Sequence, residues 1–197
     1  MVERQIPFKG AMVRALLAGT KIQTRRVCKP AQFYAMSSVV EVPDPDERGQ
    51  VYNCSHFGDE EGDVQFQSPY GGRGDRLWVR ESWAYNPDHP GVASRACFMA
   101  DPEHLHDGLK WKPSIHTPRA VCRITLEITG VRVERLQDIS EADAVAEGLT
   151  QTASGSWLPG PCDYPEWAYH YLWEQINGPG SWEANPWVWV VEFRRLT

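Results

Sequence analysis

The sequence lacks a pairing pattern among its cysteines. Their number is odd, and no two have the spacing of a Cys-x-x-Cys motif. A disulfide framework and a zinc ribbon both need such pairing, so both are disfavoured. Reduced and mostly buried thiols are therefore expected. The five residues are Cys28, Cys54, Cys97, Cys122 and Cys162.

Long apolar segments are also missing. No run approaches the roughly 18 consecutive apolar residues that a transmembrane helix requires. Residues 1–9 lack the apolar core of a secretory signal. From these two absences we predict a cytoplasmic protein that does not associate with a membrane.

Positive charge is not in excess. The chain has 20 Lys and Arg against 26 Asp and Glu, a formal net charge of −6. A protein that coats nucleic acid along its whole surface is therefore disfavoured, although a local basic site remains possible. Residues 1–30 carry seven bases and one acid, whereas residues 41–63 carry eight acids and one base. We interpret the acidic stretch, rich in Pro and Gly, as part of an irregular insertion over about 30–70.

The chain does have ample apolar material for a core. Its 197 residues are 42% hydrophobic and include nine tryptophans, which fits one folded domain with insertions. Strand patterns occur at 21–27, 76–83, 120–134 and 187–195, the third interrupted by Gly130, where a bulge or sharp bend is expected. The last of these has the composition of a buried strand.

Helices are expected between these strands. The first covers 10–18 and ends at Gly19. The second follows Ser140, a plausible N-cap, and ends at Gly148. Its inner side is expected to consist of Ala142, Val145, Ala146 and Leu149. The third covers 164–176, with Asp163 as its cap and Pro165 in its first turn. Few helices among irregularly spaced strands predict an α+β fold, with a small barrel or a strongly curved sheet.

A basic segment directly follows the first expected helix. It reads Gly-Thr-Lys-Ile-Gln-Thr-Arg-Arg over residues 19–26 and combines three cations with two hydroxyls. It can form a site for an anion or polar ligand, or supply a hydroxyl nucleophile assisted by Lys21. The alternative is an exposed polar edge strand. Lys21 and Thr24 would point to opposite faces of a regular strand, so they converge only if the segment is irregular or strongly twisted.

This segment resembles the signature of the ASCH domain family, a branch of the PUA-like superfamily. The matching positions are Gly19, Lys21, Thr24 and Arg26. Three further pieces resemble the family in the same order: Gly-Asp-Arg-Leu-Trp-Val at 74–79, the helix ending in Glu-Gly at 139–148, and Trp-Val-Val-Glu-Phe at 189–193. The resemblance covers about half of a single domain. Segments of about 30–70, 85–118 and 150–186 fall outside it and are expected to be insertions.

The resemblance implies a fold and an activity. The fold would be a PUA-like small β-barrel or strongly curved mixed sheet with flanking helices. Because Thr24 occupies a signature position, the chain most resembles family members that remove the acetyl group from N(4)-acetylcytidine. This resemblance implies that Lys21, Thr24 and Glu147 are the catalytic residues. The partner would be a modified nucleoside, with neither a metal nor an organic cofactor. The alternative is an RNA-binding module or a ribonuclease that uses the same basic cleft.

Amide hydrolysis can be assigned to these residues in two ways. In the first, Thr24 is the nucleophile and a neutral Lys21 is the base, which requires a strongly depressed lysine pKa. In the second, Lys21 stays charged and stabilises the oxyanion, while Glu147 acts as base, for instance on water. Arg25 and Arg26 are expected to bind substrate, and Arg26 either orients Glu147 or binds the oxyanion.

Two further groups of polar residues are candidates. Glu81 is a possible substrate-binding carboxylate, with an ion pair at a strand end as the alternative. His104 and His106 form a His-x-His pair, but no carboxylate or thiol follows at ligand spacing, so a surface loop is expected and no metal site is predicted.

Tryptophans form the last group. Any one of four could stack against a nucleobase, although packing in the core or at its rim is the ordinary role of such residues. The four are Trp78, Trp83, Trp187 and Trp189.

Overall fold

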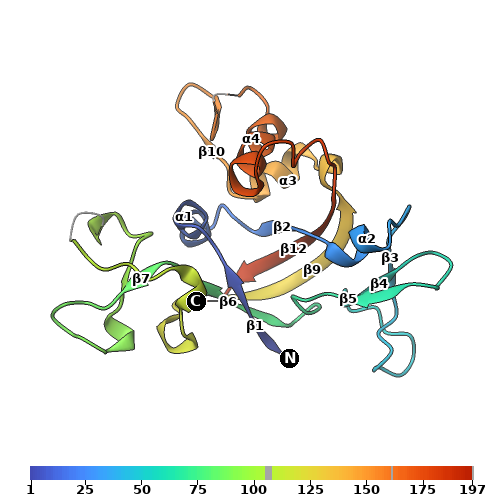
Figure 1. Ribbon diagram of the computed structural model, residues 1–197, viewed down its shortest axis with the longest axis horizontal. Helices are drawn as coiled ribbons and strands as arrows, with labels where there is room; N and C mark the ends of the chain where they lie inside the picture. Colours follow the sequence, from blue (N-terminus) through green and yellow to red (C-terminus); the bar gives the residue numbers. More distant parts are fainter. Residues whose placement is uncertain (105–107, 161, 197) are drawn as a thin grey trace.

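A five-stranded mixed sheet forms the centre of the computed structural model, which describes residues 1–104, 108–160 and 162–196 (Figure 1). The strand order is β1-β6-β9-β12-β2. β1 runs parallel to β6, and the other neighbours are antiparallel. The strands are β1 (Glu3–Pro7), β2 (Gln23–Val27), β6 (Arg76–Arg80), β9 (Thr125–Arg135) and β12 (Trp187–Arg195). The α+β prediction is confirmed. The sheet is curved but does not close into a barrel, because β1 and β2 remain unpaired edges.

β12 is buried on both faces, as its composition predicted. Trp189 and Val191 contribute to one hydrophobic cluster, and Val188 and Val190 contribute to another on the opposite face. The first cluster also contains residues of α1 (Gly10–Ala18). The second contains residues of the helices α3 (Glu141–Ala146) and α4 (Pro165–Asn177), which cover the other face of the sheet (Figure 1).

β9 contains the expected irregularity at Gly130 without being broken by it. The pairing with β12 shifts register between Glu192 and Phe193, opposite Gly130 and Ile128. The irregularity is therefore a bulge inside one strand of 11 residues. The strand starts later than expected, since η4 (Arg119–Val121) and a short connection occupy the first part of 120–134.

The strand expected at 76–83 is also interrupted. β6 ends at Arg80, and two residues later β7 (Trp83–Ala84) pairs with β8 (Cys97–Phe98) in a separate small sheet. This hairpin belongs to the segment drawn at the left of Figure 1.

α1 and α3 begin and end near the predicted positions. α1 ends at Gly19, whose φ of 74° is left-handed. α3 (Glu141–Ala146) is capped by Ser140, whose hydroxyl accepts a bond of 3.2 Å from the Asp143 N–H. The predicted inner side of α3 is confirmed only in part. Leu149 is buried and Ala146 is half-buried as expected, whereas Ala142 and Val145 are exposed. Ala144 is buried against the sheet instead.

α4 (Pro165–Asn177) begins one residue later than predicted. Pro165 lies in the first turn as expected, but the N-cap position belongs to Tyr164 and has no side-chain cap. The predicted cap by Asp163 is therefore wrong.

The segment expected to be irregular at 30–70 contains regular structure. α2 (Lys29–Phe33) is followed by a three-stranded sheet of β3 (Val40–Val42), β4 (His56–Gly58) and β5 (Gln65–Gln67). The rings of Phe57 and Phe66 lie 5.2 and 5.7 Å from the ring of Trp189. These contacts attach the small sheet to the main core, beside one end of the central sheet (Figure 1).

The remaining elements are short. β10 (Thr150–Gln151) and β11 (Trp157–Leu158) form a hairpin before α4. Single 3-10 turns occur at η1 (Ala93–Arg95), η2 (Pro102–His104), η3 (Ser114–His116) and η5 (Leu136–Asp138). Cys28, Cys54, Cys122 and Cys162 are free thiols, and Cys97 is buried. Among the described helices, none has both the length and the apolar character that crossing a bilayer demands.

Candidate functional site

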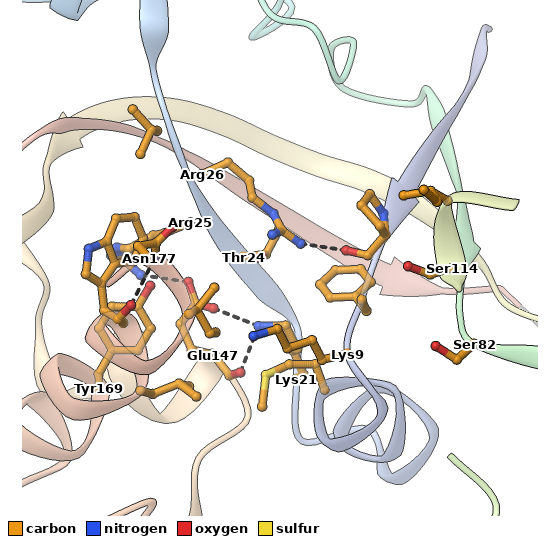
Figure 2. Close-up of a pocket in the computed structure, with 18 residues that line it drawn as sticks. Lys9, Lys21, Thr24, Arg25, Arg26, Ser82, Ser114, Glu147, Tyr169 and Asn177 are labelled. Atoms are coloured by element: carbon orange, nitrogen blue, oxygen red, sulfur yellow. Dashed lines mark hydrogen bonds and ion pairs between the residues drawn. The ribbon is translucent and has the colours of Figure 1, made fainter. Parts of the chain in front are cut away.

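A pocket of about 380 Å³ lies between the two unpaired edges of the sheet (Figure 2). Pro7 and Phe8 border it from the end of β1, and Thr24 and Arg26 border it from β2. A volume in this range suits a small organic ligand. The pocket therefore lies where β1 and β2 would pair if the sheet closed into a barrel.

Lys21 reaches the pocket because the chain is irregular just before β2. The N–H of Lys21 donates to the carbonyl of Ala15 at 3.2 Å, and that of Ile22 donates to the carbonyl of Ala146 at 2.9 Å. Regular pairing begins only at Gln23. This break allows Lys21 and Thr24, three residues apart, to border the same pocket.

Gly148 permits the close approach of the end of α3 to Lys21. Its φ is +88°, and a Cβ placed there would lie 2.8 Å from the Cβ atoms of both Ala15 and Lys21. Only glycine combines this backbone conformation with so little room. The Glu-Gly pair at the end of the helix thus brings the neighbouring Glu147 against Lys21.

Lys21 and Glu147 form a buried ion pair. The Lys21 Nζ donates to Glu147 Oε2 at 2.7 Å and to the Glu147 carbonyl at 2.8 Å, and each residue is 3% exposed. Burial lowers the pKa of Lys21, and Arg26 and Arg25 add to this effect, while Glu147 opposes it. The net effect is a lowered pKa, so the amine of Lys21 loses its proton more readily than the amine of an exposed lysine.

Arg25 holds Glu147 from the other side. Its Nη1 lies 3.4 Å from Glu147 Oε1, and its Nη2 lies 2.5 Å from Glu134 Oε1 and 3.1 Å from Asp143 Oδ2. The side chain is completely buried. Arg132 contacts Glu134 and Asp143 in turn, at 2.9 and 3.0 Å. Arg25 is thus the centre of an ion-pair network that fixes Glu147, and it also borders the pocket.

Arg26 connects the two edges of the sheet. Its Nη2 donates to the carbonyl of Pro7 at 2.8 Å, and its guanidinium carbon lies 5.2 Å from the centre of the Phe8 ring. Within the described part of the chain no carboxylate pairs with it. Arg26 therefore keeps its charge available at the pocket wall, while the expected contact with Glu147 is made by Arg25.

Thr24 completes the group. It is 4% exposed, borders the pocket, and its hydroxyl makes no hydrogen bond to any described residue. Lys21, Thr24 and Glu147 are consequently gathered at one pocket (Figure 2). A buried amine, an alcohol and a carboxylate in this arrangement have the functional groups that nucleophilic acyl transfer needs.

Glu81 lies elsewhere. Its two oxygens accept bonds of 2.9 Å from Arg123, which also contacts Asp101 at 2.7 Å. Burial raises the pKa of Glu81, and Arg123 opposes the rise. Glu81 therefore forms an ion pair, which was the alternative to a substrate-binding role. It does not border the pocket, although the adjacent Ser82 does.

Neither His104 nor any of the four tryptophan candidates borders the pocket. His104 belongs to η2 and approaches Glu103 at 3.7 Å, whereas His106 lies outside the described residues. Trp83 and Trp189 are 2% and 1% exposed and pack in the core. The other two tryptophans contact arginines, namely Trp78 with Arg80 and Trp187 with Arg135.

Sequence reasoning missed one wall of the pocket. It is formed by one face of α4 together with two residues of the segment around η3, both outside the stretch that resembles the family. The sequence shows apolar residues at helical spacing in α4, but it does not show that they face the pocket. The residues of this wall are Tyr169, Leu172, Trp173, Ile176, Asn177, Ser114 and Ile115.

Comparison with known proteins yields no matching family model, no matching curated protein and no matching solved structure.

Proposed function

We propose that the chain is a PUA-like ASCH-domain amidohydrolase that removes the acyl group from N(4)-acetylcytidine or a related acylated pyrimidine nucleoside. The observation that carries the proposal is the buried contact of Lys21 with Glu147 in the pocket that Thr24 also borders. The three residues are those that the family resemblance marked as catalytic.

The lowered pKa of Lys21 favours the assignment in which its neutral amine is the base. Glu147 is less suited to that task, because its two oxygens face Lys21 and Arg25. Both oxygens already accept hydrogen bonds from these side chains, so neither is free to face a substrate or a water molecule. The role of Glu147 is to orient the lysine amine.

The reaction then has two stages. The hydroxyl oxygen of Thr24 attacks the acyl carbonyl carbon while its proton passes to the Lys21 amine, either directly or through one water. The carbon–nitrogen bond breaks, and Lys21 returns the proton to the departing nitrogen, releasing cytidine. The acyl group remains on Thr24 as an ester. Water then loses a proton to Lys21 and attacks the ester, and Lys21 reprotonates Thr24 as the carboxylic acid leaves.

Arg26 supplies the positive charge for the oxygen of the tetrahedral intermediate. It lies on the same strand as Thr24, two residues away, and has no carboxylate partner in the described structure. A fixed cation at that position stabilises charge that develops only in the transition state.

A mass-spectrometric assay of N(4)-acetylcytidine tests the proposal. Wild-type protein is expected to release cytidine and acetate, with or without a chelator. Lys21→Met is expected to lower kcat/KM by at least about a hundredfold, the usual contribution of a general base. Glu147→Gln is also expected to lower kcat/KM, because the lysine amine loses the carboxylate that orients it. Circular dichroism would verify that both variants fold. Cleavage of labelled RNA without turnover of any acylated nucleoside would contradict the proposal and favour a ribonuclease.

A further inference from the structure

Tyr169 combines burial, a fixed ring and an unused hydroxyl at the pocket. It is 3% exposed and borders the pocket from α4. Figure 2 shows it on the same side of the pocket as Arg25 and Glu147. Its hydroxyl forms no hydrogen bond with any residue in the described ranges. A hydroxyl that borders the pocket without a partner from the chain is free to bind an acceptor on a ligand.

The ring of Tyr169 is held on several sides. Its centre lies 6.3 Å from that of Trp173, 6.4 Å from that of Trp182 and 5.9 Å from the guanidinium carbon of Arg25. None of these contacts involves the hydroxyl. The position of the hydroxyl is therefore set before a ligand arrives, which lowers the entropy lost on binding.

The hydroxyl is also a donor over a wide pH range. Burial raises the pKa of Tyr169 well above its usual value near 10, and the charge of Glu147 adds to the rise. A neutral phenol in contact with a pocket can donate its proton in a hydrogen bond to a carbonyl oxygen or ring nitrogen. Leu172 and Ile176, on the same face of α4, add apolar surface that suits a flat ring.

We infer that Tyr169 is a specificity-determining residue whose hydroxyl donates a hydrogen bond to a ring acceptor of the pyrimidine, its C2 carbonyl oxygen or N3. The inference rests on the proposed function and extends it to a helix outside the family resemblance. A pocket built to donate to a ring acceptor discriminates against rings that lack one.

The test compares Tyr169→Phe with wild type on two ligands. N(4)-acetylcytidine has the ring acceptors, whereas N-acetylaniline has the same amide on a ring without them. Tyr169→Phe is expected to raise KM for N(4)-acetylcytidine by about threefold to tenfold, the value of one neutral hydrogen bond, with kcat little changed. The inhibition constant of N-acetylaniline is expected to stay the same.

Tyr171→Phe is the matched control. Tyr171 lies two residues away on α4, is 50% exposed and does not border the pocket. The variant is expected to match wild type in KM and in inhibition by N-acetylaniline. Tyr169→Phe retains the ring contacts, so its melting temperature should remain close to that of wild type.

Two results would overturn the inference while leaving the proposed function intact. One is an unchanged KM for N(4)-acetylcytidine in Tyr169→Phe, and the other is an equal loss of affinity for both ligands. If wild type hydrolyses no acylated nucleoside, the proposed function fails, and calorimetry with cytidine becomes the test of Tyr169. Weaker cytidine binding by Tyr169→Phe would support the inference, whereas equal binding, or none by wild type, would overturn it.

Discussion

The buried pair of Lys21 and Glu147 permits a quantitative prediction about stability. Their charged atoms lie 2.7 Å apart, and with an effective dielectric constant of about 20 their attraction is about 6 kcal/mol before the loss of hydration is counted. Removing one partner of such a pair leaves the other buried and unpaired, which costs about 3–5 kcal/mol. Glu147→Gln takes from Lys21 the one carboxylate that pairs with it in the described structure, whereas Arg25 keeps Glu134 and Asp143.

A double-mutant cycle isolates this contact. Lys21→Met, Glu147→Gln and the double variant would be unfolded in urea and followed by tryptophan fluorescence. The coupling energy is expected to be about 1–3 kcal/mol, within the range for residues in direct contact. Glu3 and Arg119 provide the control, since their atoms lie 3.1 Å apart but their side chains are 40% and 47% exposed. Their coupling is expected to be clearly smaller than that of the buried pair, because solvent screens exposed charges.

The comparison separates burial from distance, because both pairs are in contact and differ mainly in exposure. A coupling between Lys21 and Glu147 no larger than that between Glu3 and Arg119 would refute the reasoning. It would mean that the amine and the carboxylate do not share a dry site in solution.

Two further predictions concern the same site. Gly148→Ala would place a methyl group 2.8 Å from the Cβ atoms of Ala15 and Lys21 at a φ of +88°, so we expect a loss of about 1–3 kcal/mol in urea unfolding; stability equal to wild type would show that α3 does not end against Lys21. Burial lowers the pKa of Lys21 below its usual 10.5, and the proposed mechanism uses the neutral amine. We therefore expect kcat/KM to fall as pH falls through that lowered pKa and to level off above it. A pH–rate profile measures this, and activity that instead declines with increasing pH over the same interval would contradict a neutral Lys21.

The elements that could be predicted from sequence are those fixed by local chemistry. α1 ends where Gly19 permits a left-handed conformation, and α3 starts where the Ser140 hydroxyl caps a free N–H. β12 has so many β-branched and aromatic residues that only a buried strand suits it. These features depend on a few neighbouring residues, so one sequence is enough to locate them.

The inner side of α3 could not be predicted in the same way. A helix of six residues has too few positions to show which side is apolar, and contact with the sheet decides that Ala144 is buried. The interruption after Arg80 has a similar origin, because the pairing of Trp83 with Phe98 directs the chain into another sheet.

The site, too, has features that the sequence predicts and features that only the packing reveals. The family resemblance selected Lys21, Thr24 and Glu147, but spacing alone could not place a helix end against the start of β2. The difference between Arg25 and Arg26 was also hidden, because it depends on which side of β2 faces the acids of β9 and α3. The wall formed by α4 lies in a segment that the resemblance does not cover, so Tyr169 emerged only from the packing.

In the proposed mechanism Thr24 is the nucleophile for an acylated nucleoside bound in this pocket. The most direct test of this role is the initial rate of cytidine release from N(4)-acetylcytidine by wild type, Thr24→Ala and Thr20→Ala. Thr20 lies in the same segment but is exposed and outside the pocket, so its variant should retain wild-type activity. Thr24→Ala is expected to lose at least about a thousandfold in kcat, whereas a wild-type rate in folded Thr24→Ala would contradict the account.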